Sequence, residues 1–299
     1  MLLFEIFGHC FVCAILGLPV EFSIHAWHVH PRTKKQFAVE DKRDMSTKPN
    51  YARFDNLKFE DFRILARDYN LSRYEKIGFP DSYRSGCEAE IFSDIANKLT
   101  CLNDAGTTIL DIGCGCSDLP SLIMARAAEQ QQTLLLLDSQ EMLDLLPSFA
   151  DHASIRKIAA RYPNCPELFR DFTEKVDGIL VYSVFQYVFV EGNIFDFLDR
   201  SLALLAPNGR MLIGDIPNTS MRKRFFSSGT GIAHHQTFTN TQELPTVNFN
   251  RLEPELIDDA VVLGLAARAR AAGFHAFIVP QSSKLPMANR REDLLLIRP

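Results

Sequence analysis

The chain has 299 residues, of which 46% are hydrophobic and 23% charged, and its formal net charge is -5. This composition is typical of a folded globular protein and excludes an intrinsically disordered one. A protein that tracks a phosphate backbone usually carries a basic face, so the acidic balance disfavours a nucleic-acid partner. Seven scattered cysteines do not form a dense disulfide framework, and we expect reduced thiols in a cytoplasmic protein.

Residues 1–49 are expected to form a poorly structured extension. Residues 2–20 are apolar, but charged and polar side chains interrupt them, and neither a basic start nor a clean cleavage site accompanies them. We therefore predict no membrane span. Cys10, Cys13 and the histidines near them could form a zinc site, but no second cysteine pair follows, and we favour the unstructured alternative.

Residues 50–105 predict a helical segment. Apolar residues recur at helical spacing over residues 57–69 and again over residues 88–99. Between these two helices, Gly78 and Pro80 mark a loop.

From residue 106 to residue 299, short buried strands alternate with helices. The predicted strands are residues 107–112, 133–138, 155–159, 176–183, 209–215, 275–279 and 293–297. The run from Leu134 to Asp138 is almost entirely hydrophobic, as expected of a strand that is covered on both faces. Strands that alternate with helices indicate an α/β fold with a mainly parallel sheet and helices on both faces.

The first strand runs into a glycine turn and then into a helix, in the segment Ile109-Leu-Asp-Ile-Gly-Cys-Gly-Cys-Ser-Asp. Gly113 and Gly115 allow a sharp turn and leave room for a ligand. The helix N-terminus beyond them presents unpaired N–H groups. Asp118 stands where the dinucleotide pattern has its third glycine, which argues against an NAD enzyme.

Asp138 ends the second strand. A carboxylate at this place can accept hydrogen bonds from both ribose hydroxyls of an adenosine. The alternative is that Asp138 caps the helix that begins near Gln140. Its position one β–α unit after the glycine turn favours the ribose role.

Four ordered segments resemble motifs of the class I S-adenosylmethionine-dependent methyltransferases. They are Leu110-Asp-Ile-Gly-Cys-Gly, Leu137-Asp-Ser-Gln-Glu-Met-Leu, Asp177-Gly-Ile-Leu-Val-Tyr-Ser-Val-Phe-Gln-Tyr-Val and Leu205-Ala-Pro-Asn-Gly-Arg-Met-Leu-Ile. The resemblance covers roughly residues 50–299. It implies a seven-stranded sheet of order 3-2-1-4-5-7-6 with the last strand antiparallel, and a helical lid over residues 50–105 on the substrate side of a methyltransferase domain over residues 106–299.

The resemblance also implies S-adenosylmethionine as the cofactor. The residues implied to bind it are Asp111, Gly113, Cys114, Gly115, Asp138, Ser139, Ser183 and Gln186. The chain departs from the family at Ser117, which replaces the usual third glycine of the first motif. It departs again at residues 160–162, where the family often has an acidic residue near the adenine, so the adenine contacts stay open.

Methyl transfer needs an aligned acceptor and, in some reactions, a base. Asp215, His234 and His235 follow the fifth strand and are the candidate catalytic residues, and a histidine is suited to deprotonating a hydroxyl near neutral pH. Alternatively, Asp215 caps a loop and the two histidines are solvated. Arg222-Lys-Arg224 could bind a phosphate or carboxylate of the acceptor, or form an exposed helix face.

The sequence has no Asn-Pro-Pro-Tyr-like segment, and no Pro-Cys nucleophile follows the fourth strand. The loop over residues 76–84 resembles that of bacterial methyltransferases associated with surface-saccharide assembly. The leading hypothesis is therefore O-methylation of a small-molecule acceptor, sugar-like or phosphorylated. The alternatives are methylation of RNA or protein through the same cofactor site, and a non-catalytic binding module with a methyltransferase-like fold.

Overall fold

A computed structural model describes residue 54 and residues 57–148, 154–251 and 253–299. These residues belong to a compact unit, Asn50–Pro299. The predicted N-terminal extension and its zinc alternative lie outside the described residues.

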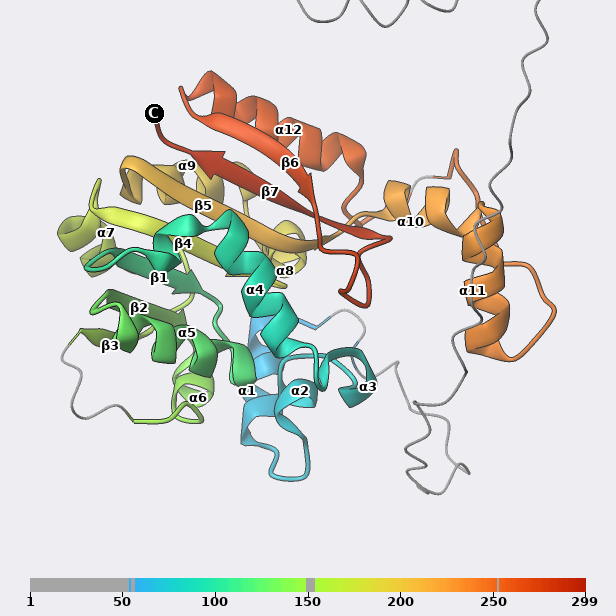
Figure 1. Cartoon of the computed structure of the whole chain (residues 1–299), viewed down its shortest axis with the longest axis horizontal. Coiled ribbons are helices and arrows are strands. Elements are labelled where there is room, and N and C mark those ends of the chain that lie inside the picture. Colours follow the sequence, from blue (N-terminus) through green and yellow to red (C-terminus); the bar gives the residue numbers. More distant parts are fainter. Residues whose placement is uncertain (1–53, 55–56, 149–153, 252) are drawn as a thin grey trace, which may run out of the picture. The chain divides into compact units, whose positions relative to one another are not determined.

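The described strands form one seven-stranded sheet of order β3-β2-β1-β4-β5-β7-β6 (Figure 1). The strands β1 to β5 run parallel to one another, whereas β7 is antiparallel to both β5 and β6. The fold class and the strand order expected from the sequence are thereby confirmed. The strands are β1 (Thr108–Ile112), β2 (Thr133–Asp138), β3 (Ile155–Ala159), β4 (Val176–Tyr182), β5 (Leu205–Pro217), β6 (His275–Pro280) and β7 (Arg291–Ile297).

The fifth strand is longer than the sequence predicts. It begins at Leu205 instead of Gly209, because Leu205 pairs with Val176 ahead of an irregularity in the register with β4. Twelve α-helices surround the sheet in the described part of the chain. They are α1 (Phe59–Arg67), α2 (Arg73–Lys76), α3 (Asp81–Arg84), α4 (Glu88–Lys98), α5 (Asp118–Glu129), α6 (Gln140–Leu143), α7 (Pro166–Phe172), α8 (Phe185–Glu191), α9 (Ile194–Leu204), α10 (Thr219–Phe226), α11 (Gly229–Thr239) and α12 (Asp259–Ala271).

Alternate residues of the strands pack into two hydrophobic clusters on opposite faces of the sheet. Leu110 of β1 faces the cluster that α9 and α12 cover, and Ile109 faces the cluster that α4 and α5 cover. The two-residue period of a strand sends successive side chains to opposite faces, and the hydrophobic runs of the sequence supply both. Helices on both faces are therefore a direct consequence of strands that are apolar throughout.

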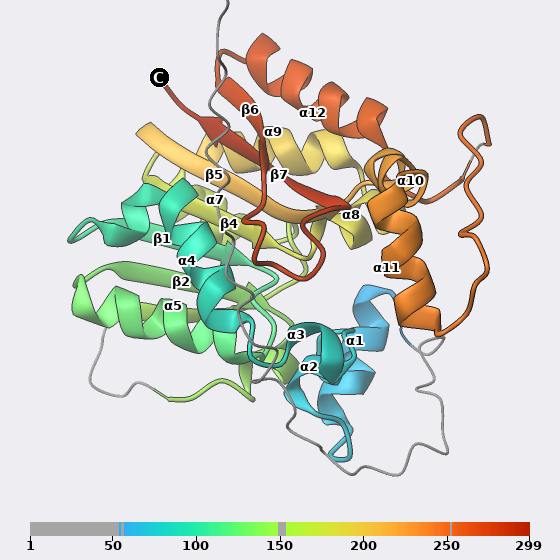
Figure 2. The same cartoon turned by 45° about the vertical axis from the view of Figure 1, so that its right-hand side comes forward.

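Two groups of helices lie outside these layers. The short helices α1 to α3 gather near the ends of the central strands, and α10 and α11 extend away from the sheet beyond the end of β5 (Figures 1 and 2). Both groups lie toward the carboxyl ends of the parallel strands, which is where open α/β sheets bind ligands. No described helix has the length and the apolar character that a membrane span needs.

A buried ion cluster joins α4 to the end of the sheet. Lys98 Nζ lies 2.7 Å from Oδ2 of Asp293 and 2.6 Å from Oδ2 of Asp94. Asp293 is fully buried and also accepts a hydrogen bond of 2.8 Å from the backbone N–H of Asp215. A buried carboxylate needs such partners because leaving water is costly for a charge. The cluster thereby holds α4 against the carboxyl end of β5.

We expect Lys98→Ala to destabilise the protein by about 3–5 kcal/mol, because it leaves two largely buried carboxylates without their shared cation. Urea unfolding followed by circular dichroism measures this loss. The matched control is Lys284→Ala, since Lys284 forms an exposed pair with Glu90, and such pairs contribute about 0–1 kcal/mol. Equal losses in the two variants would contradict the role assigned to the cluster.

Candidate functional site

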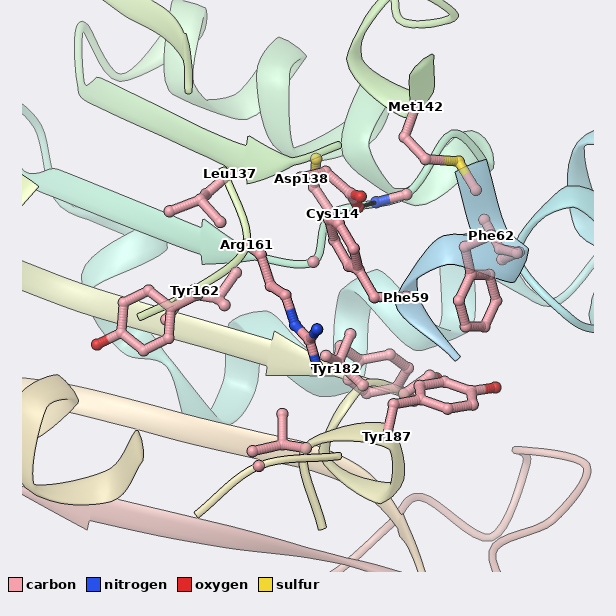
Figure 3. Close-up of a pocket in the computed structure, with 18 of the residues that line it drawn as sticks. Phe59, Phe62, Cys114, Leu137, Asp138, Met142, Arg161, Tyr162, Tyr182 and Tyr187 are labelled. Carbon is pink, nitrogen blue, oxygen red and sulfur yellow. Dashed lines mark hydrogen bonds between the residues drawn. The ribbon is translucent and has the colours of Figure 1, made fainter. Parts of the chain in front are cut away.

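A cavity of about 440 Å³ opens at the carboxyl ends of β1, β2 and β4. Its size is that of a small-molecule or cofactor site. It lies beside the point where the strand order reverses, since β1 has β2 on one side and β4 on the other. Figure 3 shows Cys114 and Asp138 on one side of this pocket, Tyr182 and Tyr187 on the other, and Phe59 and Arg161 between them.

The glycine turn forms one wall of the pocket. Gly113 and Gly115 have positive φ angles of 74° and 64°, which side chains disfavour. A Cβ at Gly113 would lie 2.6 Å from Cγ2 of Val184, and a Cβ at Gly115 would lie 2.8 Å from Cγ2 of Ile77. The turn therefore needs glycine for its conformation and for its close contact with the segments around it.

Asp138 links the ends of β1 and β2. Its Oδ2 accepts a hydrogen bond of 2.8 Å from the N–H of Gly115, and its Oδ1 accepts one of 2.6 Å from the N–H of Ser139. Each carboxylate oxygen has a second lone pair that these bonds leave available. Burial raises the pKa of Asp138 to about 6, while the N–H groups of Gly115 and Ser139 and the side chain of Ser139 act in the opposite direction.

Ser139, and not Asp138, caps the following helix. Its hydroxyl accepts a hydrogen bond of 3.3 Å from the N–H of Met142 in the first turn of α6. The alternative that Asp138 caps this helix is therefore wrong, because Ser139 is the capping residue. The carboxylate of Asp138 lines the pocket, whereas Ser139 is absent from the lining.

Asp111 lies behind the pocket wall. It is 3% exposed, and burial, together with the charge of Asp138, raises its pKa to about 8. Asp111 is therefore mostly a neutral carboxyl group near pH 7. Cys114 lines the pocket as a thiol, because burial raises its pKa well above the ordinary value.

A chain of hydrogen bonds crosses the ends of β4 and β5. Ser183 has a positive φ of 60° at the end of β4 and lines the pocket. Its Oγ accepts a hydrogen bond of 3.0 Å from Nη1 of Arg84 and donates one of 2.5 Å to Oδ2 of Asp215. The Asp215 carboxylate is buried and also lies 2.7 Å from Nη1 of Arg291. Ser183 thus connects the pocket to a carboxylate that does not line it.

Arg84 belongs to the pocket wall although sequence reasoning gave it no role. Its guanidinium is buried, lies over the rings of Phe79 and Tyr182 at 5.1 and 5.6 Å, and forms an ion pair of 3.2 Å with Glu88. In the sequence Arg84 ends a loop rich in polar residues, and nothing in this pattern distinguishes a buried arginine from an exposed one. Only the packing of α3 against the end of β4 distinguishes it.

The helix α1 covers the pocket with Phe59 and Phe62. At its N-terminus, the N–H of Phe59 donates a hydrogen bond of 2.8 Å to Glu191 at the end of α8. One turn later, Arg63 makes two hydrogen bonds of 3.0 and 2.9 Å to Glu141 of α6. The contacts of α1 therefore join elements that follow β2 and β4.

The segment after β3, whose contacts the sequence left open, also reaches the pocket. Ala160, Arg161 and Tyr162 all line it. Nη2 of Arg161 lies 3.4 Å from Oε1 of Glu191, and its guanidinium lies 5.6 Å from the centre of the Phe59 ring. A cation thus stands here in place of the acidic residue that the family resemblance implies.

Three other predicted residues do not line the pocket. His234 and His235 lie in α11, where their rings pack against Phe226 at 6.3 and 6.2 Å. Gln186 donates a hydrogen bond of 2.8 Å to the carbonyl of Ser183 and so supports the end of β4 from behind. No cluster of three or more residues able to hold a metal ion occurs among the described residues.

No family model and no curated protein matches the sequence. Similar folds are found among solved structures. A SAM-dependent methyltransferase from Aquifex aeolicus is 12% identical with a TM-score of 0.46, over 75% of this chain and 96% of that one. The plantazolicin methyltransferase BpumL, solved with SAH, is 16% identical with a TM-score of 0.47, over 80% and 96%. The CurJ carbon methyltransferase is 15% identical with a TM-score of 0.47, over 73% and 56%. At these scores, the fold of this chain rests on its own strand order and its chemistry on its own residues.

The raised pKa of Asp111 predicts a loss of stability with rising pH. The folded protein keeps this proton up to about pH 8, whereas an unfolded aspartic acid loses it near pH 3.9. The stabilisation is therefore complete below about pH 4 and disappears as the pH rises through about 8. Asp111→Asn, which stays neutral, should flatten the decline by up to about 1.4 kcal/mol per pH unit.

Urea unfolding between about pH 6.5 and 8 measures this slope in a range where Asp138 is already largely ionised. The control is Asp104→Asn, because Asp104 is an exposed carboxylate. If Asp111→Asn and the parent protein show the same slope, the assignment of a buried neutral carboxyl at this position is wrong.

Proposed function

We propose that the chain is an S-adenosylmethionine-dependent methyltransferase whose cofactor binds between the glycine turn and Asp138. The observation that carries the proposal is the contact between Gly115 and Asp138, which brings the glycine turn and a carboxylate into one pocket wall at the switch point of the sheet.

The residues of the pocket fit this cofactor. The available lone pairs of Asp138 match two ribose hydroxyls, and Gly113 and Gly115 line the pocket beside this carboxylate. Arg84, whose Nη2 makes no hydrogen bond with any residue the structure describes, would pair with the carboxylate of the methionine part. When bound, S-adenosylmethionine supplies an electrophilic methyl group.

We further propose that Ser183 and Asp215 handle the proton of a hydroxyl acceptor. Ser183 Oγ already donates to Asp215 and accepts from Arg84, which leaves one lone pair for an acceptor hydroxyl. The acceptor proton would pass to Ser183 Oγ as the serine proton passes to Asp215. In this scheme Asp215 carries the role for which the sequence also named His234 and His235.

A small acceptor suits the pocket better than a macromolecule. The lid helix α1 lies over the pocket and is held by Glu141 and Glu191, which favours an enclosed ligand. O-methylation is the reaction that the proposed hydroxyl relay serves. The formal net charge of -5 likewise disfavours an RNA substrate.

We expect Asp138→Ala to weaken binding of S-adenosylhomocysteine by about 10- to 100-fold, the usual effect of losing a hydrogen bond to a charged group. Isothermal titration calorimetry measures it, and Asp144→Ala, which removes an exposed carboxylate nearby, is the control. Binding to the parent protein should also weaken as the pH falls through about 6, where Asp138 takes up a proton. Unchanged affinity in folded Asp138→Ala, or binding of NAD in place of S-adenosylhomocysteine, would contradict the proposal.

We expect Asp215→Asn to lower the rate of methyl transfer by about 100-fold or more, because a positioned base contributes that much. Transfer of labelled methyl groups into the small-molecule fraction of a cell extract provides the measurement. Affinity for S-adenosylhomocysteine should stay within about twofold of the parent. His234→Ala is the comparison: a larger loss of rate in that variant than in Asp215→Asn would assign the base to the histidine.

A further inference from the structure

The basic run at residues 222–224 does not act as one patch. Lys223 lies 2.6 Å from Glu253, and Arg224 lies 2.5 Å from Asp259, so both charges are neutralised within the domain. Arg222 forms no ion pair with any residue the structure describes. Its guanidinium instead lies 5.4 Å from the centre of the Phe226 ring. One cation of the three is therefore available to a ligand.

A second available cation comes from the other end of the chain. Arg290 precedes β7, and its guanidinium lies 5.9 Å from the centre of the same Phe226 ring. It donates a hydrogen bond of 3.0 Å to Oδ1 of Asn289. It is half-buried and forms no ion pair within the described part of the chain. Phe226 thus carries two arginines that form no ion pair with any carboxylate among the described residues.

These two arginines are connected to the pocket through Arg291. Arg291, the neighbour of Arg290, places its guanidinium 5.7 Å from the centre of the Phe79 ring, and Phe79 lines the pocket. Burial and then the charges of Arg291 and Arg222 lower the pKa of Arg290. The guanidinium groups of Arg222, Arg290 and Arg291 are therefore within electrostatic reach of one another.

We propose that Arg222 and Arg290 bind a phosphate group carried by the small-molecule methyl acceptor. The proposal rests on the methyltransferase function proposed above and names the class of its substrate. Two guanidinium groups that are not held in ion pairs match the charge of about -1.5 to -2 on a phosphate monoester. A guanidinium also presents paired N–H donors that fit phosphate oxygens.

A small phosphorylated molecule fits these residues better than a nucleic acid does. A protein that follows a nucleic-acid backbone uses many phosphate contacts, whereas α10 offers one available arginine and neutralises its two other cations. The site therefore has the charge for one phosphate, and Arg291 connects it to Phe79 in the wall of the pocket that would hold the rest of the molecule.

The test measures binding of inorganic phosphate to the full chain by isothermal titration calorimetry at constant ionic strength, with acetate as the carboxylate probe. We expect phosphate to bind and acetate to bind at least about tenfold more weakly. Acetate carries a single negative charge and has fewer oxygens to accept hydrogen bonds from two guanidinium groups. Arg222→Gln and Arg290→Gln should each weaken phosphate binding by about 10- to 100-fold. Arg224→Gln is the matched control, since it removes the same charge from the same helix but from a residue that is paired with Asp259.

Each arm separates this proposal from the cofactor site. Affinity for S-adenosylhomocysteine should be the same in all three variants. If the parent protein does not bind S-adenosylhomocysteine, the proposed function is wrong, while the phosphate measurements still decide the anion site.

Equal effects of Arg222→Gln and Arg224→Gln, or acetate binding as tight as phosphate, would overturn the anion site. A single-stranded RNA oligonucleotide that binds more tightly than phosphate, and loses affinity in Arg222→Gln, would overturn the assignment to a small molecule. Arg222 is exposed, so its variant keeps the test valid if Arg290→Gln fails to fold.

Discussion

The hydrogen bond from the N–H of Gly115 to the carboxylate of Asp138 is the interaction on which the proposed cofactor site depends. It joins the turn after β1 to the end of β2, two elements that are 23 residues apart in the sequence. A carboxylate that leaves water needs hydrogen-bond donors, and the turn supplies one because its glycines adopt positive φ angles. The same contact holds the remaining lone pairs of Asp138 in the pocket wall, where a ribose could use them.

The other side of the pocket is built from buried charges that compensate one another. Arg84, Asp215 and Arg291 would each be costly to bury alone, but the hydrogen bonds through Ser183 join them into one network. Asp293 extends this network to Lys98 of α4. Such a network holds its members in place, because moving any one of them leaves another charge unpaired. The ends of β4 and β5 are thereby rigid where an acceptor would be aligned, which is the condition for efficient transfer.

The helix α1, which covers the pocket, is attached by contacts of another kind than these buried charges. The helix α1 is joined to its surroundings by hydrogen bonds of Arg63 to Glu141 and of the Phe59 N–H to Glu191, and by the packing of Phe62 and Ala66 against Met142. Of these contacts, a partly exposed ion pair such as that of Arg63 contributes little to stability. The pocket thus combines a network of buried charges at the strand ends with an aromatic cover, an arrangement suited to enclosing a ligand.

The sequence by itself determined where the strands and the glycine turn lie along the chain. Hydrophobic runs of strand length alternate with amphipathic helices, and these local patterns survive in the structure because each strand needs only to be apolar on both faces. Gly113, Gly115 and Asp138 were identified for the same reason, since each lies at a strand end that the local pattern marks. The family resemblance supplied the order of the strands in the sheet, including the placement of β7 between β5 and β6, which periodicity alone does not show.

Tertiary structure alone decided which charged residues are available. Arg84 is buried, and Arg222 and Arg290 share one aromatic ring, yet in the sequence they look like ordinary polar surface residues. The partners of Lys223 and Arg224 lie 30 and 35 residues further along the chain, so no local pattern could show that they are neutralised. His234 and His235 follow the fifth strand in sequence, but α10 and α11 extend away from the sheet and place them outside the pocket lining. Proximity along the chain constrains where a strand ends, whereas the pairing of charges depends on contacts that form only when distant segments pack together.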